Sequence, residues 1–310
     1  MPKYSRRRWL SNSALLLGSV FAGSALTACT SAPTKLVRRN SLRLVFYTDV
    51  HAMVKRRASA GVVQAATAIN TAQPDLILGG GDYIDGGFTS TREAIAPHWD
   101  IYMSMHNALQ APVFPAIGNH DLVNAQEANY GALVSDDPRK EYRRYLDLSE
   151  TWYSFDEFGY HFIVLDSMNV VGGELGYEGR LNDDQLEWLR EDLSQTSRNT
   201  PIVLCLHMPL LTSLYAATQG NEFGGPANRV MVDNVAVLEL FSRHNLILVL
   251  QGHLHVAEVI RWRDITFITG GAICGNWWRG QRLGTEEGFY VIDLNDNRVN
   301  WEYVDYGWDV

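Results

Sequence analysis

Residues 111–124 read APVFPAIGNHDLVN, an apolar run that ends abruptly in polar side chains. The apolar run stops at Gly118, and Asn119, His120 and Asp121 follow it directly. An apolar segment that ends in glycine is typical of a buried strand at its carboxyl end. The cluster would therefore place an amide, an imidazole and a carboxylate at a sheet edge, where α/β proteins assemble their binding sites.

Six further apolar runs also end in glycine or polar residues, and they span residues 42–51, 75–82, 161–167, 201–207, 246–255 and 265–271. Continuous apolar runs predict strands that are covered on both faces. Apolar residues at helical spacing predict helices over residues 59–72, 91–110, 181–197 and 228–245. Two hairpins are predicted at 152–166 and 288–306, turning at Gly159 and at 295–297. This order of elements indicates one α/β domain with two packed β-sheets.

Five of the runs end in side chains that can bind metal ions: D-V-H at 49–51, G-D-Y-I-D at 81–85, G-N-H-D at 118–121, His207, and G-H-L-H at 252–255. Residues two apart on an extended segment point the same way, so both ends of D-V-H can grip one ion. By the same spacing, His253 and His255 can both reach the site from one loop. Each motif is common on its own, and the order of all five carries the prediction.

In this order the motifs resemble the signature of the calcineurin-like metallophosphoesterases, across residues 49–255. The D-x-H and G-D-x-x-D forms are similar to class III cyclic nucleotide phosphodiesterases of bacteria. The resemblance implies a four-layer α/β/β/α sandwich, with two mixed sheets flanked by helices, and two bound divalent metal ions. It implies that Asp49, His51 and His255 hold the first ion, that Asp82 bridges both, and that Asn119, His207 and His253 complete the second.

The resemblance also implies roles for three polar neighbours of these ligands. His120 would face the substrate, stabilising charge on the phosphoryl oxygens or protonating the leaving alkoxide. Asp85 would hydrogen-bond the His120 imidazole and keep it charged. Asp121 is expected to be structural, capping the following turn.

The expected activity is hydrolysis of phosphoesters, as a phosphodiesterase or phosphatase, by a water or hydroxide that bridges the two ions. Carboxylate, amide and imidazole ligands together favour Mn, Fe or Zn over Ca or Mg, without choosing among the three. The alternative is an exported metal-binding lipoprotein without catalysis, in a binding or scaffold role. His120 and Asp85 argue against that alternative, because a binding protein needs neither.

Residues 270–281, GGAICGNWWRGQ, are the candidate substrate segment. A planar group could stack on Trp277 or Trp278, with Arg279 near a phosphate. The open alternative is that one tryptophan packs under the loop and the other caps the core. The substrate itself is not predicted.

The first 29 residues are predicted to be a signal peptide, because basic residues precede a short apolar stretch. S-R-R-R-W-L at 5–10 resembles a twin-arginine export signal, and L-T-A-C at 26–29 resembles a lipobox. Cys29 is therefore expected to be lipidated, with 30–40 as a tether and 41–310 as the metallophosphoesterase domain. The twin-arginine machinery and a membrane, reached by the lipid anchor only, are the expected partners at the cell envelope. The alternative is cleavage near Cys29 and a soluble exported protein.

The chain is acidic, with 35 acidic against 26 basic residues and a formal net charge of −9 over 310 residues. An acidic globule repels a nucleic-acid backbone, so nucleic-acid binding is not expected. Cys205 and Cys274 both lie beside apolar runs. They are expected to be buried thiols, with a disulfide as the alternative.

Overall fold

The computed structural model describes residues 41–126, 137–171 and 174–310. The described residues belong to one compact unit, Asn40–Val310. The predicted signal peptide, its Cys29 and the tether lie outside the described residues. Within the described ranges, no helix combines the length and the apolar character needed to cross a membrane.

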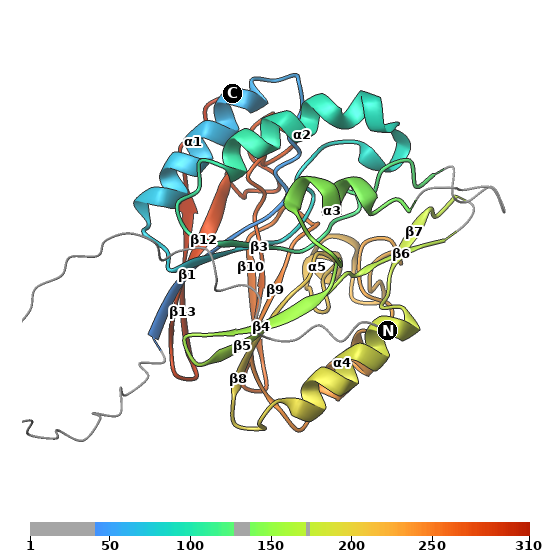
Figure 1. Ribbon diagram of the computed structural model, residues 1–310, viewed down its shortest axis with the longest axis vertical. Coiled ribbons are helices and arrows are strands. Elements are labelled where there is room, and N and C mark those ends of the chain that lie inside the picture. The colour runs from blue at the N-terminus through green and yellow to red at the C-terminus, as the bar shows by residue number, and fades with distance from the viewer. Residues whose placement is uncertain (1–40, 127–136, 172–173) are drawn as a thin grey trace, which may run out of the picture. The chain divides into compact units, whose positions relative to one another are not determined.

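The first of the two large sheets has five strands in the order β13-β12-β1-β2-β3 (Figure 1). The strands are β1 Ser41–Tyr47, β2 Leu76–Gly79, β3 Val113–Pro115, β12 Gly288–Asn295 and β13 Arg298–Asp305. β1, β2 and β3 are parallel to one another, whereas β12 is antiparallel to both of its neighbours. The sheet is therefore mixed.

The second sheet has six strands in the order β10-β11-β9-β8-β5-β4. The strands are β4 Tyr153–Glu157, β5 Tyr160–Val164, β8 Pro201–Cys205, β9 Asn245–Gln251, β10 Glu258–Trp262 and β11 Ile265–Thr269. Its four central strands are parallel, and both edge strands are antiparallel. A separate small ribbon pairs β6 Met168–Val170 with β7 Tyr177–Gly179.

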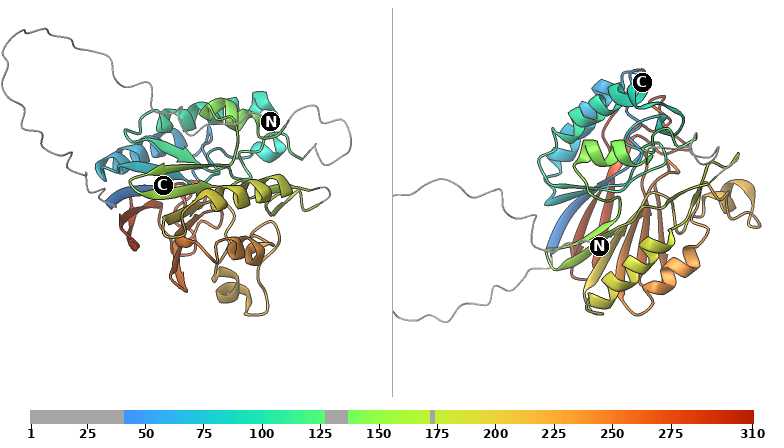
Figure 2. Two further views of the ribbon diagram at one scale, coloured as in Figure 1. Left: turned by 60° about the horizontal axis from the view of Figure 1, so that its bottom comes forward. Right: turned by 45° about the vertical axis from the view of Figure 1, so that its right-hand side comes forward.

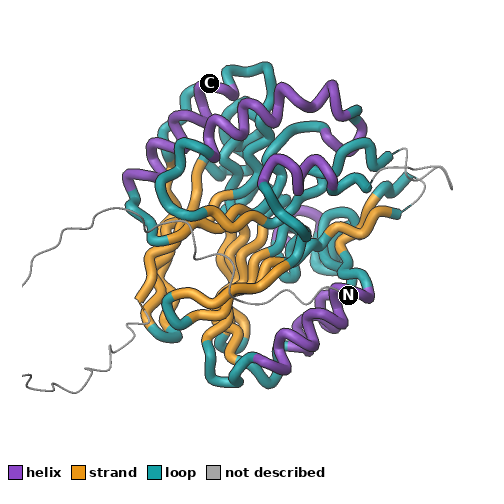
Figure 3. Tube along the Cα trace, in the orientation of Figure 1, coloured by secondary structure: helices purple, strands orange, loops and turns teal. Residues whose placement is uncertain are grey.

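Helices cover the outer faces of both sheets (Figures 1 and 2). They are α1 Ala58–Thr71, the 3-10 turn η1 Gly87–Thr89, α2 Arg92–His106, α3 Lys140–Leu146, α4 Asp183–Gln195, α5 Leu214–Gln219 and α6 Asn234–Leu240. α1 and α2 lie over the first sheet, while α4 lies on the opposite side, along the second (Figure 3). The predicted arrangement of two mixed sheets flanked by helices is confirmed.

The period of two along a strand separates the core into layers, as β1 shows. Leu44 and Phe46 point between the two sheets and belong to one buried cluster with Phe162 of β5. Val45 and Tyr47 point the other way and belong to the cluster that includes α1 and α2. Both faces of β1 are therefore buried, which accounts for its continuous apolar sequence.

Most predicted elements are present, but the helix expected over 228–245 is reduced to α6. The preceding segment is bonded to neighbouring loops instead: the Met231 N–H donates to Pro209 O at 2.9 Å, and the Val232 N–H to Gly179 O at 2.8 Å. Backbone groups used in this way cannot continue a helix. The hairpin of β4 and β5 does turn at Phe158 and Gly159, both with positive φ, as a tight hairpin turn requires.

Candidate metal centre

The parallel strands of both sheets deliver the predicted ligands from the loops that follow their carboxyl ends. β1 leads to Asp49 and His51, β2 to Asp82, β3 to Asn119, β8 to His207, and β9 to His253 and His255. All seven side chains are buried, and none is more than 5% exposed. Seven polar side chains in one buried place need strong compensating interactions.

The backbone of these loops is strained where the ligands lie. Asp49, His51, Asp82, His253 and His255 all have positive φ, between 41° and 71°. Residues other than glycine rarely adopt this region, and each instance costs on the order of 1–3 kcal/mol. Such strain concentrates at functional sites, where the surrounding fold enforces it.

Two glycines in the motifs are needed for close approach between loops. A Cβ atom on Gly118 would lie 2.2 Å from Asp82 Oδ1, and one on Gly252 would lie 2.2 Å from Thr48 Oγ1. Both glycines therefore let loops from different strands pack at the carboxylates of the site.

Asp82 lies between two groups of imidazoles. Its Oδ2 atom is 3.2 Å from His207 Nε2 and 3.6 Å from His51 Nε2. Its Oδ1 atom accepts the His120 backbone N–H at 2.7 Å, which fixes the carboxylate. Of the seven side chains, this carboxylate occupies the position that the predicted bridging role requires.

The first group combines His51, His255 and Asp49. The two Nε2 atoms are 3.1 Å apart, and Asp49 Oδ1 lies 3.2 Å from His255 Nε2 and 3.8 Å from His51 Nε2. Asp49 Oδ2 accepts hydrogen bonds from the Thr48 hydroxyl and the His253 N–H. Asp49 Oδ1 is buried and has no hydrogen-bond donor among the described residues, so a cation is the partner it lacks.

The second group combines His207, His253 and Asp82. His207 Nε2 lies 3.1 Å from His253 Nδ1, and all three side chains offer ligand atoms within 4.8 Å of one another. Asn119 is also buried, and its Oδ1 has no hydrogen-bond partner in the described parts of the chain. An amide oxygen left in this state fits a neutral metal ligand.

The outer nitrogens of three imidazoles face carbonyl oxygens, which can only accept. His207 Nδ1 lies 2.7 Å from Gly80 O, His253 Nε2 lies 3.0 Å from Asn228 O, and His255 Nδ1 lies 2.6 Å from Gly275 O. Each outer nitrogen therefore carries the hydrogen, and each inner nitrogen of a neutral ring presents a lone pair. Lone pairs that face each other across 3.1 Å repel unless a cation lies between them. The donor set thus fits two divalent metal ions.

The buried carboxylates favour positive charge between the facing imidazoles of each group. Burial alone would lower the pKa of His51 and His207, yet Asp49 and Asp82 raise it to about 10 and about 9, respectively. Burial lowers the pKa of His253 and His255. The carboxylates therefore favour positive charge at both imidazole pairs, which a bound cation supplies.

The predicted hydrogen bond between Asp85 and a charged His120 is not formed. Asp85 Oδ1 lies 3.5 Å from His120 Nδ1 and is closer, at 3.3 Å, to His51 Nδ1. His120 Nδ1 instead accepts the Gly86 N–H at 2.9 Å. Burial lowers the pKa of His120 to about 4, so the ring is neutral with its hydrogen on Nε2. The Asp85 carboxylate thus lies near both imidazoles and is closer to that of the ligand His51.

His120 nevertheless lies beside the centre. Its ring meets the His51 ring edge to face at 4.4 Å, and its side chain remains 26% exposed. A buried ligand set with one partly exposed imidazole next to it offers a donor that a substrate can reach.

Asp121 is structural, as expected, but it does not cap the following turn. Its carboxylate accepts backbone N–H groups of Gly118, Asp82 and Tyr83, at 2.8–2.9 Å, and a longer one from Ile84. Asp121 thereby fastens the loop after β3 to the loop after β2, and so holds Asp82 in place.

The tryptophan pair is divided between core and site. Trp278 is 1% exposed, and its indole N–H donates to His51 O at 3.0 Å, so its ring is not available for stacking as predicted. Trp277 is half-buried, with its ring 4.5 Å from the His255 ring. Arg279 is exposed, and among the described residues it makes no contact with the metal centre. The alternative in which one tryptophan packs under the loop holds for Trp278.

Sequence reasoning missed three residues near the centre. The Arg282 guanidinium lies 5.2 Å from the Trp277 ring centre, and Arg229 follows Asn228, the carbonyl partner of His253. Cys274 offers a third ligand atom next to His51 and His255. Both Cys205 and Cys274 are buried free thiols, and burial raises the pKa of both well above the ordinary thiol value.

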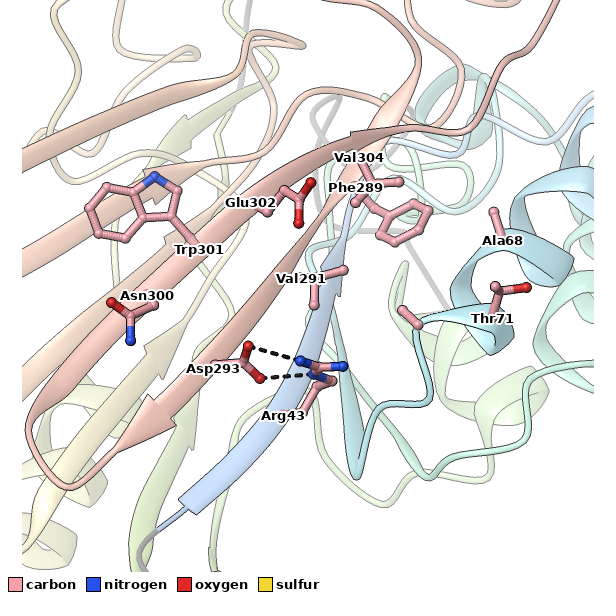
Figure 4. Close-up of a pocket in the computed structure, with 11 residues that line it drawn as sticks. Arg43, Ala68, Thr71, Phe289, Val291, Asp293, Asn300, Trp301, Glu302 and Val304 are labelled. Carbon is pink, nitrogen blue, oxygen red and sulfur yellow. Dashed lines mark hydrogen bonds and ion pairs between the residues drawn. The ribbon is translucent and has the colours of Figure 1, made fainter.

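A groove elsewhere on the domain has a different character. It lies between α1 and the strands β12 and β13, and Figure 4 shows Arg43 and Asp293 facing each other along its wall. This ion pair is bidentate, at 2.8 and 3.0 Å, and exposed. Phe289 and Val304 supply apolar lining. None of the predicted site residues lines this groove.

Two imidazole groups on either side of one carboxylate fit the ligands of a dinuclear metal site. Residues 42–257 match the calcineurin-like phosphoesterase family over most of the chain, and the chain belongs to that family. Membership of this family supports metal-dependent hydrolysis of phosphoesters.

Two relatives and one solved structure extend the comparison. A protein from Synechococcus named a probable cyclic nucleotide phosphodiesterase is 28% identical, covering 81% of this chain and 82% of its own. A protein of the same description from Xenorhabdus bovienii is 23% identical, covering 73% and 80%. The crystal structure of a dimetal phosphatase from Danio rerio covers 86% of this chain and 99% of its own, with 15% identity and a TM-score of 0.58. That structure is similar in fold.

Proposed function

We propose that this protein hydrolyses phosphoesters, as a phosphodiesterase or phosphatase, with two divalent metal ions held by the seven buried ligands. The observation that carries the proposal is the pair of imidazole groups, each with facing nitrogens 3.1 Å apart, on either side of Asp82. The relatives described as cyclic nucleotide phosphodiesterases support a phosphoester substrate. Mn, Fe and Zn all suit these ligands.

The ligands divide into two sets that share one carboxylate. His51, His255 and Asp49 would hold one ion, and His207, His253 and Asn119 the other, with Asp82 between them. When bound, the two ions supply a nucleophilic hydroxide at neutral pH and neutralise charge on the phosphoryl oxygens. The protein contributes fixed positions, because carbonyl groups hold His207, His253 and His255, and backbone N–H groups hold Asp49 and Asp82.

His120 would donate a hydrogen bond to the reacting phosphoester. The Gly86 N–H occupies Nδ1, which leaves the Nε2 hydrogen free to point at a phosphoryl oxygen or the leaving oxygen. A fixed tautomer costs no reorganisation during the reaction. Asp85 acts indirectly, as a positioning residue for the ligand His51.

We also propose that the protein is exported by the twin-arginine route and anchored through a lipid on Cys29. The basic start, the short apolar stretch and the L-T-A-C sequence support this proposal. Mass spectrometry of the mature N-terminus tests it, with Cys29→Ser as the matched variant. A diacylated Cys29 is the expected result, and an unmodified N-terminus downstream of Cys29 would contradict the anchor.

The activity is tested with the Mn-loaded domain on nitrophenyl phosphate, bis-nitrophenyl phosphate, cyclic AMP and a nucleotide diphosphate ester. We expect turnover of at least one ester, loss of it with a chelator, and recovery when Mn is returned. A chain that binds two ions but hydrolyses none of the four would support the non-catalytic alternative instead. Elemental analysis of the same samples separates that outcome from a failure to bind metal.

A further inference from the structure

Arg282 is connected to the metal centre through Trp277. The guanidinium lies 5.2 Å from the centre of the Trp277 ring, which itself lies 4.5 Å from the His255 ring and 5.3 Å from the His51 ring. An arginine resting on an indole keeps its hydrogen-bond donors directed outward from the ring edge. Arg282 Nε is buried and has no hydrogen-bond partner among the described residues.

The backbone around Arg282 is fixed close to the ligand loop. Arg282 and Thr285 exchange two backbone hydrogen bonds of 2.9 Å, which close a tight turn. The Thr285 hydroxyl accepts the Ala257 N–H at 3.1 Å, two residues after His255. The turn therefore places Arg282 at the rim of the first ligand group.

Arg229 lies next in the chain to a residue that contacts the second ligand group. It follows Asn228, whose carbonyl lies 3.0 Å from His253 Nε2. On its other side, Val230 packs against a small buried cluster that includes Leu254, the residue between the two ligands of the G-H-L-H motif. The residues on both sides of Arg229 are thus fixed next to the second ligand group.

The two guanidinium groups influence each other and have no carboxylate of their own. Burial and the neighbouring Arg229 lower the pKa of Arg282, while Asp49 raises it. In the described parts of the chain neither guanidinium forms an ion pair, in contrast to Arg139, which pairs with buried Asp166. Two unpaired cations next to a metal centre are a cost that a bound anion relieves.

We propose that Arg282 and Arg229 form an anion-binding pair that makes the centre select phosphomonoesters, with two negative charges on the phosphate, over singly charged diesters. The inference rests on the proposed function and names its substrate class. A guanidinium binds two oxygens of one phosphate at once, and a terminal phosphate offers more free oxygens than a diester does. Trp277 acts as the positioning residue for Arg282.

Binding of AMP and cyclic AMP tests the pair, because the two ligands share a nucleoside and differ in phosphate charge. Isothermal titration of the Mn-loaded protein is expected to show tighter binding of AMP. Arg282→Gln and Arg229→Gln should each weaken AMP about tenfold or more, and cyclic AMP by less than about threefold. Arg282→Lys should recover part of the loss, because it keeps the charge without the planar fork.

Arg261→Gln is the matched control, since Arg261 also rests on a tryptophan ring, 4.9 Å from the centre of Trp301. It should leave both affinities unchanged. Elemental analysis should find the same metal content in all variants, so that a loss of AMP binding is not a loss of metal. Equal weakening of both nucleotides, or none, would overturn the inference.

Kinetics separate this inference from the proposed function. With nitrophenyl phosphate and bis-nitrophenyl phosphate, Arg282→Gln should raise KM for the monoester and leave the diester nearly unchanged. If the wild-type protein hydrolyses neither ester, the proposed function fails, while the comparison of AMP with cyclic AMP still decides whether the arginine pair discriminates by charge.

Discussion

The two sheets contribute different chemistry to one centre. Loops after the first sheet supply the oxygen ligands Asp49, Asp82 and Asn119, with His51 as their only imidazole among the seven ligands. Loops after the second sheet supply imidazoles alone: His207, His253 and His255. Of the four contacts of 3.1–3.2 Å that define the centre, three join the sheets: His51 to His255, Asp49 to His255 and Asp82 to His207. Neither sheet holds a complete site.

Hydrogen bonds between the sheets fix this arrangement. The His253 N–H donates to Asp49 Oδ2 at 3.0 Å, and His207 Nδ1 donates to Gly80 O at 2.7 Å. The ligand positions therefore depend on how the two sheets pack. Four predictions test what each sheet contributes to the centre, from the largest expected effect to the smallest.

Removing the shared carboxylate should have the largest effect. Asp82→Ala takes away the carboxylate that contacts imidazoles of both ligand groups. We expect kcat/KM to fall by about a thousandfold or more, which corresponds to about 4 kcal/mol of transition-state stabilisation. Metal content, measured by elemental analysis, should fall with it. Asp293→Ala, which removes an exposed carboxylate paired with Arg43, is the matched control and should keep both.

Removing His120 should separate turnover from metal binding. His120→Ala deletes a hydrogen-bond donor that follows β3 of the first sheet and is not a metal ligand. The metal content should stay unchanged, while turnover of alkyl phosphoesters falls by about 10²–10⁴-fold. Turnover of nitrophenyl esters should fall less, because their leaving groups need less assistance from a proton donor. His106→Ala on α2 is the control, and equal losses on both kinds of ester would contradict the donor role.

Removing the Asp85 carboxylate should weaken only one ligand group. Asp85→Asn removes the negative charge next to His51 Nδ1 and leaves the Gly86 hydrogen bond to His120 in place. We expect one of the two ions to bind about 10- to 100-fold more weakly, as measured by competition with a chelator. An unchanged affinity with a changed dependence on the leaving group would instead assign Asp85 to His120.

The second sheet also contains an imidazole that is held differently from the ligands. Both ring nitrogens of buried His161 lie 2.7 Å from carboxylates, those of Asp156 and Asp192. Burial alone would lower the pKa of His161, but these hydrogen bonds raise it. The folded state therefore binds a proton more tightly, so this stabilisation is present below the unfolded pKa of about 6.5 and is lost as pH rises through the folded value.

This difference predicts a small effect of pH on stability. His161→Gln should lower the free energy of unfolding by about 1 kcal/mol more at about pH 5.5 than at about pH 9. Chemical denaturation of the metal-loaded protein at both pH values measures it. An equal cost at both pH values would mean that His161 is uncharged and merely packed.

The ligands were predictable because strand ends and a spacing of two residues determine where they meet. Asp49, Asp82 and His207 each directly follow an apolar run, and the order of the runs identifies the family. The neutral state of His120 was not predictable, because it depends on one backbone N–H, that of Gly86, reaching Nδ1. The burial of Trp278 was not predicted either, although the sequence contains a signal for it.

That signal is a glycine inside a helix. A Cβ atom on Gly61 of α1 would lie 2.1 Å from the Trp278 ring, so the glycine makes room for the indole. The choice of Arg282 over Arg279 had no such signal, since the tight turn between Arg282 and Thr285 decides which guanidinium lies against Trp277. Loop geometry decides which residues lie at the rim of the metal centre, whereas the order of the strands decides which residues are its ligands.

The central claim is that the two sheets together hold two metal ions around Asp82. Anomalous diffraction from crystals of the Mn-loaded protein tests it most directly. We expect two anomalous peaks about 3.5–4 Å apart, one beside His51 and His255 and the other beside His207 and His253. A single peak, or peaks away from Asp82, would contradict the account.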